Sequence, residues 1–299
     1  MWRSTLETKR VKAGDGTGIA YQALGKGTRA VVLANGLGGR LYAWEPLIEA
    51  LWPHYRIITW DYRGLFDSDS PPTHSDLRIP HHAHDAVAIL DAEGIERAAF
   101  VGWSMGVLVS LELTALYAHR VEGLVLVNGI HGHALETGFQ PLFRVPGVPK
   151  LLHAVIEGLI DRPELAAHLA KLTRAVEIPT TVLFSLTAGR RSRHLRPLMR
   201  QYYDDVLGPS FENFMRLFQE LDAHSVYHVL RQVAAPTLVI SGALDPLAPA
   251  YQSKEIARRI PGARHVSVPL GSHFCLVERP EVVVPQITRF LAEELRWAP

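Results

Sequence analysis

The stretch "FVGWSMGVLV" (residues 100–109) places one hydroxyl in an otherwise apolar run. Ser104 lies between Gly102 and Gly106, with a strand-like segment before it and a helix-like segment after it. In a G-x-S-x-G motif at a strand-to-helix turn, the serine is lifted out of the sheet in a strained backbone conformation. The flanking glycines remove Cβ atoms that would collide there. The motif therefore predicts a nucleophile at Ser104, in preference to a small hydroxyl merely tolerated in a buried segment.

Short apolar runs rich in β-branched residues alternate with helix-like stretches on both sides of this motif. The expected strands lie at 30–34, 56–60, 98–102, 123–127, 237–241 and 264–268, after an N-terminal hairpin around "DGTG" (15–18). The expected helices cover 46–52, 79–93, 105–118, the region of 255–259, and 281–295. Continuous apolar strands that alternate with helices indicate an α/β protein with a mostly parallel sheet covered on both faces.

The alternation stops between residues 131 and 234, where amphipathic helices are expected at 149–160, 164–176 and 210–233. We therefore expect a core formed by 1–130 and 235–299 and a helical cap formed by 131–234. Its Phe, Leu and Met residues predict an apolar pocket beneath a lid. The arginine-rich stretch "GRRSRHLRPLMR" (189–200) is interpreted as a solvated face, with an anionic ligand or partner as the alternative.

Bulk composition narrows the function classes. The chain has 299 residues, is 47% hydrophobic and carries a formal net charge of +1, so nucleic acid is not an expected partner. Cys275 is the single cysteine, which excludes an intrachain disulfide and suits a reducing, cytoplasmic compartment. The start, "MWRSTLETKR", lacks the apolar segment of a secretory signal. The apolar run from Ala98 to Ala118 has the length of a membrane span, but its neighbours favour a buried strand followed by a buried helix.

A serine is a weak nucleophile at neutral pH and needs a base, which in turn needs an orienting acid. On the elbow motif and the order of its elements, the sequence resembles the α/β-hydrolase superfamily, in particular its capped, esterase-like members, over nearly the whole chain. The resemblance implies an eight-stranded α/β-hydrolase fold and the chain order serine, acid, histidine. It identifies Asp245 in "SGALDPLAP" (241–249) as the acid and His273 in "PLGSHFCLVERP" (269–280) as the base. Some family members carry the acid after the preceding strand, where this chain has Asn128.

The resemblance also implies an oxyanion hole made by the backbone N–H groups of Met105 and Leu37. Leu37 belongs to "NGLGG" (35–39), where Asn35 replaces the histidine usual in the family. A backbone donor does not depend on the preceding side chain, and Asn35 can still hydrogen-bond the loop. The stretch "DYRGLFDSDSP" (61–71) resembles the family's loop after the next strand, with Phe66 in place of the second glycine. Its Asp61 and Arg63 are expected to be structural, and Phe66 to alter the loop path or line the pocket.

The chain contains 15 histidines, a residue type that often binds metal ions. The run "HHAHD" (81–85) resembles a zinc-hydrolase motif, but Ala86 replaces its final histidine. The run also lies in a predicted helix, which would fan the side chains apart. We therefore expect no metal and no cofactor.

The sequence thus predicts a serine hydrolase that cleaves a small, apolar carboxylic ester or lactone. Other uses of the same triad stay open: carbon–carbon bond hydrolysis, peracid formation and acyl transfer. A ligand receptor with a slow triad is the alternative outside catalysis. The insert helices offer a surface for a homodimer.

Overall fold

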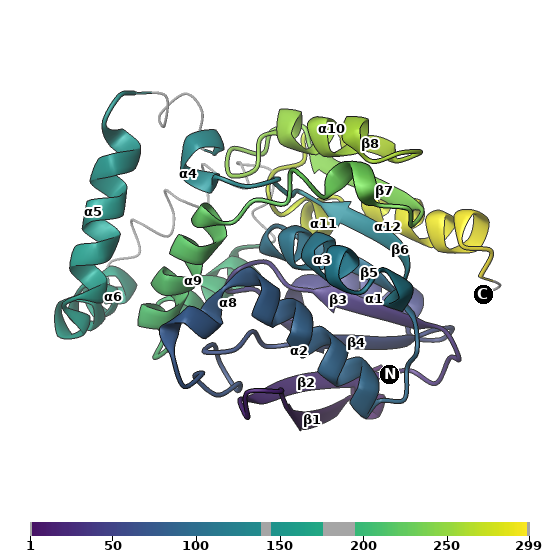
Figure 1. The fold of residues 1–299 in the computed structure, drawn as a ribbon, viewed down its shortest axis with the longest axis horizontal. Helices are drawn as coiled ribbons and strands as arrows, with labels where there is room; N and C mark the ends of the chain where they lie inside the picture. The colour runs from purple at the N-terminus through teal and green to yellow at the C-terminus, as the bar shows by residue number, and fades with distance from the viewer. Residues whose placement is uncertain (1, 139–144, 176–194, 298–299) are drawn as a thin grey trace.

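The predicted hairpin and the six apolar runs form one sheet of eight strands in the computed structural model, which describes residues 2–138, 145–175 and 195–297 (Figure 1). The strand order is β1-β2-β4-β3-β5-β6-β7-β8. Strands β1 and β2 pair antiparallel to their neighbours, and the other strands run parallel. The strands are β1 (Glu7–Lys12), β2 (Gly18–Leu24), β3 (Ala30–Ala34), β4 (Arg56–Trp60), β5 (Ala98–Trp103), β6 (Val121–Val127), β7 (Thr237–Gly242) and β8 (Arg264–Val268). The predicted fold class is confirmed.

Helices cover both faces of this sheet, as continuous apolar strands require. One layer holds α2 (Ile79–Ala92), α3 (Met105–Leu116) and α10 (Ala250–Arg259). The other holds α1 (Glu45–Leu51), α11 (Cys275–Glu278) and α12 (Pro280–Arg289). Along β3, Val32 packs in the first layer's core while Val31 and Leu33 pack in the second, because successive strand side chains point to opposite faces. Figure 1 shows α2 and α3 in front of the sheet.

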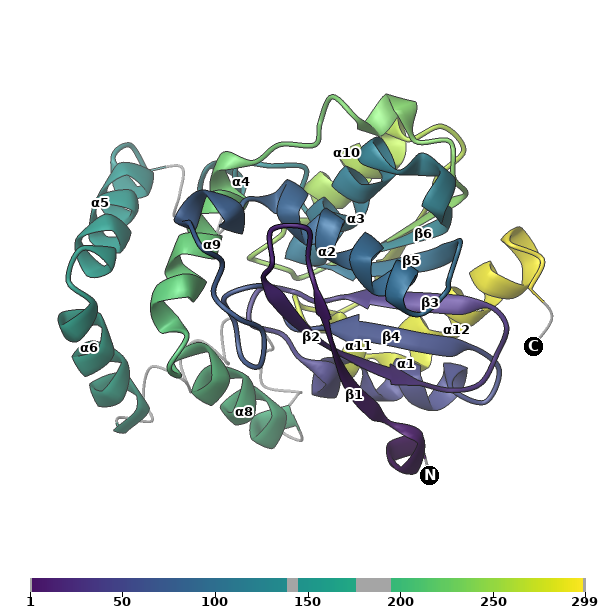
Figure 2. The ribbon, with the colours of Figure 1, turned by 60° about the horizontal axis from the view of Figure 1, so that its bottom comes forward.

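The segment between β6 and β7 is helical. It contains α4 (Ala134–Thr137), α5 (Val148–Ile160), α6 (Pro163–Ala175), α8 (Arg196–Val206) and α9 (Phe211–Ala223). Its described residues form no strand beyond a single bridge between Gly132 and Ser225. Figures 1 and 2 show α9 between the sheet and the outlying pair α5 and α6. These three helices share a small apolar cluster of Ile156, Ile160, Ala166 and Met215.

One helix prediction in this segment was wrong, and one helix was not predicted. The helix expected over 210–233 ends at Ala223, because the next residues pair with the chain near His131: the Val226 N–H donates to the His131 carbonyl at 3.0 Å. Helix α8 was not predicted, since Pro197 and the arginines of 189–200 obscured its apolar positions. Two of those arginines, Arg196 and Arg200, are exposed on α8, whereas 189–194 lie outside the described residues.

The apolar run 98–118 divides into a strand and a helix. Strand β5 ends at Trp103 and helix α3 begins at Met105. Within the described ranges, no helix has the length and apolar character needed to cross a membrane.

Candidate active site

Ser104 occupies the sharp turn between β5 and α3. Its φ of 55° and ψ of −116° lie in a region that non-glycine residues rarely adopt. The two flanking glycines give this turn its room. A Cβ on Gly102 would overlap the carbonyl oxygen of Gly106, and a Cβ on Gly106 would overlap the carbonyl oxygen of Ala34 on β3. The turn therefore depends on both glycines, and it exposes the serine hydroxyl at the carboxyl end of the sheet.

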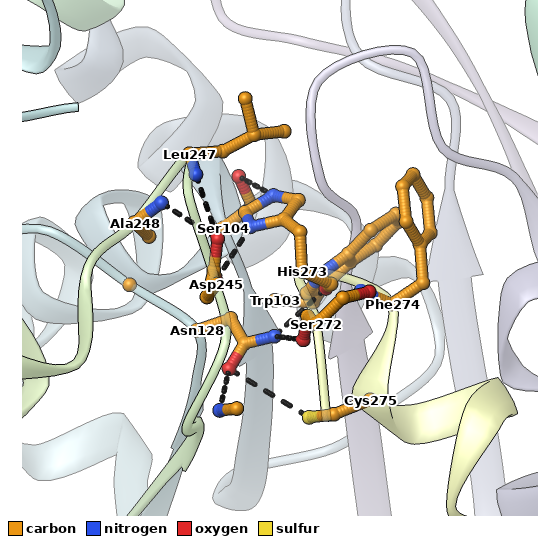
Figure 3. Close-up of polar contacts among 12 residues, drawn as sticks. Trp103, Ser104, Asn128, Asp245, Leu247, Ala248, Ser272, His273, Phe274 and Cys275 are labelled. Atoms are coloured by element: carbon orange, nitrogen blue, oxygen red, sulfur yellow. Dashed lines mark hydrogen bonds and ion pairs between the residues drawn. The ribbon is translucent and has the colours of Figure 1, made fainter. Parts of the chain in front are cut away.

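Three predicted site residues from distant parts of the chain lie in one hydrogen-bonded line (Figure 3). The Ser104 Oγ lies 3.0 Å from His273 Nε2, and His273 Nδ1 lies 2.8 Å from Asp245 Oδ2. Asp245 follows β7 and His273 follows β8, so adjacent parallel strands deliver both residues to the same edge of the sheet. Both side chains are buried.

The other carboxylate oxygen of Asp245 is held by main-chain donors. Its Oδ1 accepts the N–H groups of Leu247 at 2.8 Å and Ala248 at 2.9 Å. Hydrogen bonds of this kind fix the orientation of a carboxylate. The oxygen Oδ2 is thereby aimed at the imidazole, in the arrangement by which a carboxylate orients a histidine base.

The two residues predicted to supply the oxyanion donors, Met105 and Leu37, line the same pocket as the serine. Met105 is the first residue of α3, so its N–H has no acceptor within the helix. Leu37 lies in the loop after β3, and both residues line the same pocket as Ser104 and His273. A carbonyl oxygen placed between these two backbone groups would meet N–H donors and the positive end of the α3 dipole.

Asn35 secures the loop that carries Leu37. Its buried side-chain amide donates to the Trp60 carbonyl at 2.6 Å, and its Oδ1 accepts the Trp44 indole N–H at 2.6 Å. The Asn35 carbonyl accepts the Tyr62 hydroxyl at 2.6 Å. The asparagine thus bonds the loop to the neighbouring strand β4 and to the residue that precedes α1.

The pocket beside Ser104 has a volume of about 170 Å³ and a mainly apolar wall. Its charged or polar side chains, among the described residues, are Ser104, His273, Asn128 and Tyr202. The Tyr202 hydroxyl, which comes from α8, donates to the Leu37 carbonyl at 2.9 Å. The apolar wall consists of Leu37, Met105, Ile130, Ala134, Phe214, Phe218, Leu221, Leu247 and Ala248.

Residues 29–280 match the family model described as alpha/beta hydrolase fold. The chain belongs to the alpha/beta hydrolase fold family. A curated relative, "Putative carbamate hydrolase RutD" from Klebsiella pneumoniae (strain 342), is 28% identical over 256 residues, which cover 84% of this chain and 86% of the relative.

Solved structures resemble this alpha/beta hydrolase along almost its whole length. The enol-lactonase from Burkholderia xenovorans LB400 has a TM-score of 0.74 at 25% identity, covering 95% of this chain and 100% of its own. The esterase RhEst1 from Rhodococcus sp. ECU1013 has a TM-score of 0.72 at 25% identity, covering 96% and 98%.

The 61–71 loop of this alpha/beta hydrolase is held by ion pairs. The Arg63 guanidinium contacts both oxygens of Asp85 on α2, at 2.8 and 2.5 Å, and Asp15 at 2.7 Å. Asp61 pairs with Arg40 at 3.2 Å, and burial raises the pKa of its carboxyl to about 6. These contacts fit the expected structural roles of Asp61 and Arg63.

Phe66 and Cys275, two residues named in the sequence analysis, are not part of the wall of the Ser104 pocket. Phe66 has a φ of 53° and packs under the Arg40 guanidinium at 4.7 Å. Burial raises the pKa of the Cys275 thiol, which keeps it protonated and a poor nucleophile.

The histidine-rich run 81–85 forms the start of α2. His82 is buried, with its Nε2 3.0 Å from the Leu77 carbonyl, and Asp85 forms an ion pair with Arg63. The described ranges contain no group of three or more His, Cys, Asp or Glu side chains that could hold a metal ion.

The sequence alone does not predict the parts that three side chains play at this site. Trp103 occupies a variable position of the elbow motif, although a buried strand residue with an indole N–H needs an acceptor. Tyr202 lies in the unpredicted helix α8, so no periodic pattern points to it. For Asn128, the sequence indicates only that an acid is absent from this position.

Proposed function

We propose that this alpha/beta hydrolase is a serine hydrolase that cleaves a carboxylic ester or lactone through an acyl-enzyme. The observation that carries the proposal is the unbroken line Ser104–His273–Asp245, with distances of 3.0 and 2.8 Å. Each member has the partner that its role requires: a base within reach of the nucleophile, and an acid that holds the base.

In the acylation step, His273 Nε2 removes the Ser104 proton as Oγ attacks the substrate carbonyl carbon. The carbonyl π electrons move to oxygen, and the N–H groups of Leu37 and Met105 stabilise that oxyanion. Asp245 keeps the Nδ1 proton in place and stabilises the imidazolium. When the oxyanion collapses, the bond to the alkoxy group breaks and His273 returns the proton to the leaving alcohol.

In the deacylation step, a water molecule takes the place of Ser104 as nucleophile. His273 removes its proton, the water oxygen bonds to the acyl carbon, and the second oxyanion occupies the same backbone donors. Collapse then breaks the bond to Ser104 Oγ, which recovers its proton from His273. The acid leaves, or, for a lactone, the opened hydroxy acid leaves as one molecule.

We also propose that residues 131–234 act as a cap that selects the substrate. Phe214, Phe218 and Leu221 of α9 contribute to the pocket wall, as does Tyr202 of α8. An uncharged, largely apolar acyl group suits such a wall, because a charged group would lose its hydration without gaining a partner.

The test is a substrate panel on the purified protein and on Ser104→Ala. We expect turnover of short-chain p-nitrophenyl esters or of lactones, and a loss of at least about 1,000-fold in kcat for the variant. A variant that keeps full turnover would overturn the proposal. So would a wild-type protein that a fluorophosphonate fails to label, which would favour a binding role.

A carbamate ester is the second candidate, because the curated relative carries the name of a putative carbamate hydrolase. A carbamate presents the same carbonyl to Ser104, with nitrogen in place of the carbon attached to that carbonyl. Comparing p-nitrophenyl acetate with p-nitrophenyl carbamate separates the two, because CH₃ and NH₂ have nearly the same size. A higher kcat/KM for the carbamate, after correction for its spontaneous rate, would reassign the substrate class.

A further inference from the structure

The main-chain carbonyl of His273 accepts two side-chain hydrogen bonds from different strands. The Trp103 indole Nε1 donates to it at 2.9 Å, and the Asn128 amide Nδ2 donates to it at 2.8 Å. In the described part of the chain, no main-chain N–H donates to this oxygen. Figure 3 shows the two side chains reaching the histidine from the strand ends.

Trp103 is the last residue of β5 and directly precedes Ser104. Its indole therefore links the residue before the nucleophile to the backbone of His273. Its ring also packs against the His273 and Phe274 rings, with centroids 5.7 and 5.4 Å away. The other side of the indole faces the oxyanion loop, since a Cβ on Gly36 or Gly39 would lie 2.8 Å from its atoms. One side chain therefore fixes the spacing between nucleophile, base and oxyanion loop.

Asn128 directly follows β6 and is fully buried, with a φ of 48° that asparagine tolerates better than most residues. Its Nδ2 donates to the carbonyls of Ser272 and His273, each at 2.8 Å. Its Oδ1 accepts the Gly242 N–H at 2.7 Å, at the end of β7. The amide nitrogen thus donates two hydrogen bonds while the amide oxygen accepts one. An aspartate, which has no N–H group, cannot make the same set.

We propose that Trp103 and Asn128 are positioning residues that clamp the His273 carbonyl and thereby set the imidazole between Ser104 and Asp245. The inference rests on the proposed function, since it gives His273 the part of the base. It assigns Asn128 a task other than that of an acid: the side chain holds the backbone of the histidine, and its amide is aimed at carbonyl oxygens.

The clamp matters because His273 lies in a loop. Its neighbour Ser272 is fixed by its N–H, which donates to Glu278 Oε2 at 2.8 Å. Trp103 and Asn128 fix the next residue, because both donate to the main-chain carbonyl of His273 itself. Small displacements of a catalytic base lower kcat steeply, whereas substrate binding in an apolar pocket depends on other residues.

The first test replaces the indole donor and keeps an aromatic ring. We expect Trp103→Phe to lower kcat about 10-fold with KM changed less than about two-fold. The matched control is Trp297→Phe, a buried indole whose Nε1 donates to Glu122 at 2.9 Å at the opposite end of the sheet. That control should keep the wild-type kcat. Active-site titration with a fluorophosphonate supplies the number of competent sites, so that kcat is not confused with the folded fraction.

The second test changes the amide without changing its size. Asn128→Asp replaces the donor with an oxygen that faces two carbonyl oxygens, and we expect a fall in kcat of about 100-fold per titrated site. Asn213→Asp is the control, because the Asn213 amide donates to the Gly64 carbonyl at 2.9 Å, away from the pocket wall. Wild-type kcat per site in both Trp103→Phe and Asn128→Asp would overturn the clamp.

A spectroscopic readout separates the clamp from the proposed function. The Nδ1 proton of His273, hydrogen-bonded to Asp245, should give a downfield proton resonance in the wild type that moves or broadens in both clamp variants and persists in Trp297→Phe. A resonance unchanged in the clamp variants would reject the clamp whatever the substrate is. If the wild type turned over none of the esters and lactones, the proposed function would be rejected. The resonance of the His273 Nδ1 proton would still test the clamp.

Discussion

At Ser104, a φ of 55° places a non-glycine residue in backbone strain of about 1–3 kcal/mol. Asn128 has a comparable φ of 48° at the end of the neighbouring strand. The Ser104 hydroxyl reaches the His273 imidazole and the Asn128 amide reaches the His273 carbonyl. At Ser104 the backbone strain accompanies the placement of the hydroxyl, while the surrounding hydrogen bonds keep the chain there.

Buried His82 makes the fold sensitive to acid. Burial lowers its pKa to about 3, from about 6.5 in the unfolded chain, so the folded state holds the imidazole neutral. Its contribution to stability is therefore complete above pH 6.5 and is lost as the pH falls toward 3. We expect His82→Gln to reduce the drop in unfolding free energy between pH 7 and pH 5 by about 2 kcal/mol. Urea titrations at the two pH values measure it, and parallel pH dependences for variant and wild type would contradict it.

The residues of the candidate site could be named from the sequence only where a motif or a chain order pointed to them. The glycines around Ser104 indicated the turn, and the resemblance to the α/β-hydrolase superfamily implied Asp245 and His273 through its chain order of serine, acid and histidine. The contacts of Trp103 and Asn128 could not be predicted, because their acceptor is a main-chain oxygen, which every residue has and no sequence pattern marks. The use of Asn35 as a loop anchor was foreseen in kind, but not its partners Trp60 and Trp44.

Among the elements, the strands were the easier prediction. Buried parallel strands are short continuous apolar runs, and each of the predicted runs pairs in the sheet. Helix α8 escaped because its buried positions, such as Met199 and Tyr203, are few and its surface is strongly polar. The end of α9 escaped because it is set by pairing of Ser225 with Gly132, a contact between segments distant in sequence.

The strand-to-helix turn gives a stability prediction. Gly106→Ala would drive a Cβ into the main-chain atoms of Ala34, which cannot rotate away. We expect a loss of at least about 3 kcal/mol in unfolding free energy, or no folded protein. The control is Gly158→Ala inside α5, where an added Cβ meets nothing within 4 Å. That change should stabilise by about 0.5–1 kcal/mol because alanine favours the helix. Equal effects of the two variants in thermal melts would refute the steric account.

Helix α8 is hydrogen-bonded to the loop that carries Leu37, the proposed oxyanion donor. The Tyr202 hydroxyl donates to the Leu37 carbonyl, and its ring stacks edge-on against Phe274 at 5.5 Å. Because Tyr202→Phe removes the hydrogen bond and keeps the ring, we expect kcat to fall about 3- to 10-fold with little change in KM. Tyr227→Phe, which removes a hydroxyl bonded to Glu255 at 3.0 Å, serves as the control. Steady-state kinetics that give the same kcat for Tyr202→Phe and wild type would show that the bond does not tune the loop.

At the scale of the whole molecule, charge has little part in substrate capture. The formal net charge is +1, and the described pocket wall holds no Asp, Glu, Lys or Arg side chain. Electrostatic steering needs a strong field of one sign at the site. We therefore expect kcat/KM for a neutral ester to change less than about two-fold between 0.05 and 0.5 M NaCl. A fall of about 10-fold over that range would indicate steering by charges that the pocket wall does not supply.

In the proposed mechanism, Ser104 carries the acyl group during turnover. Peptide mass spectrometry of the enzyme, quenched with acid within the first turnovers of p-nitrophenyl acetate, tests this step. We expect an acetyl group on the peptide that contains Ser104, appearing with the burst of p-nitrophenol and absent from Ser104→Ala. An acetyl group on another residue, or full turnover with Ser104 unmodified throughout, would contradict it.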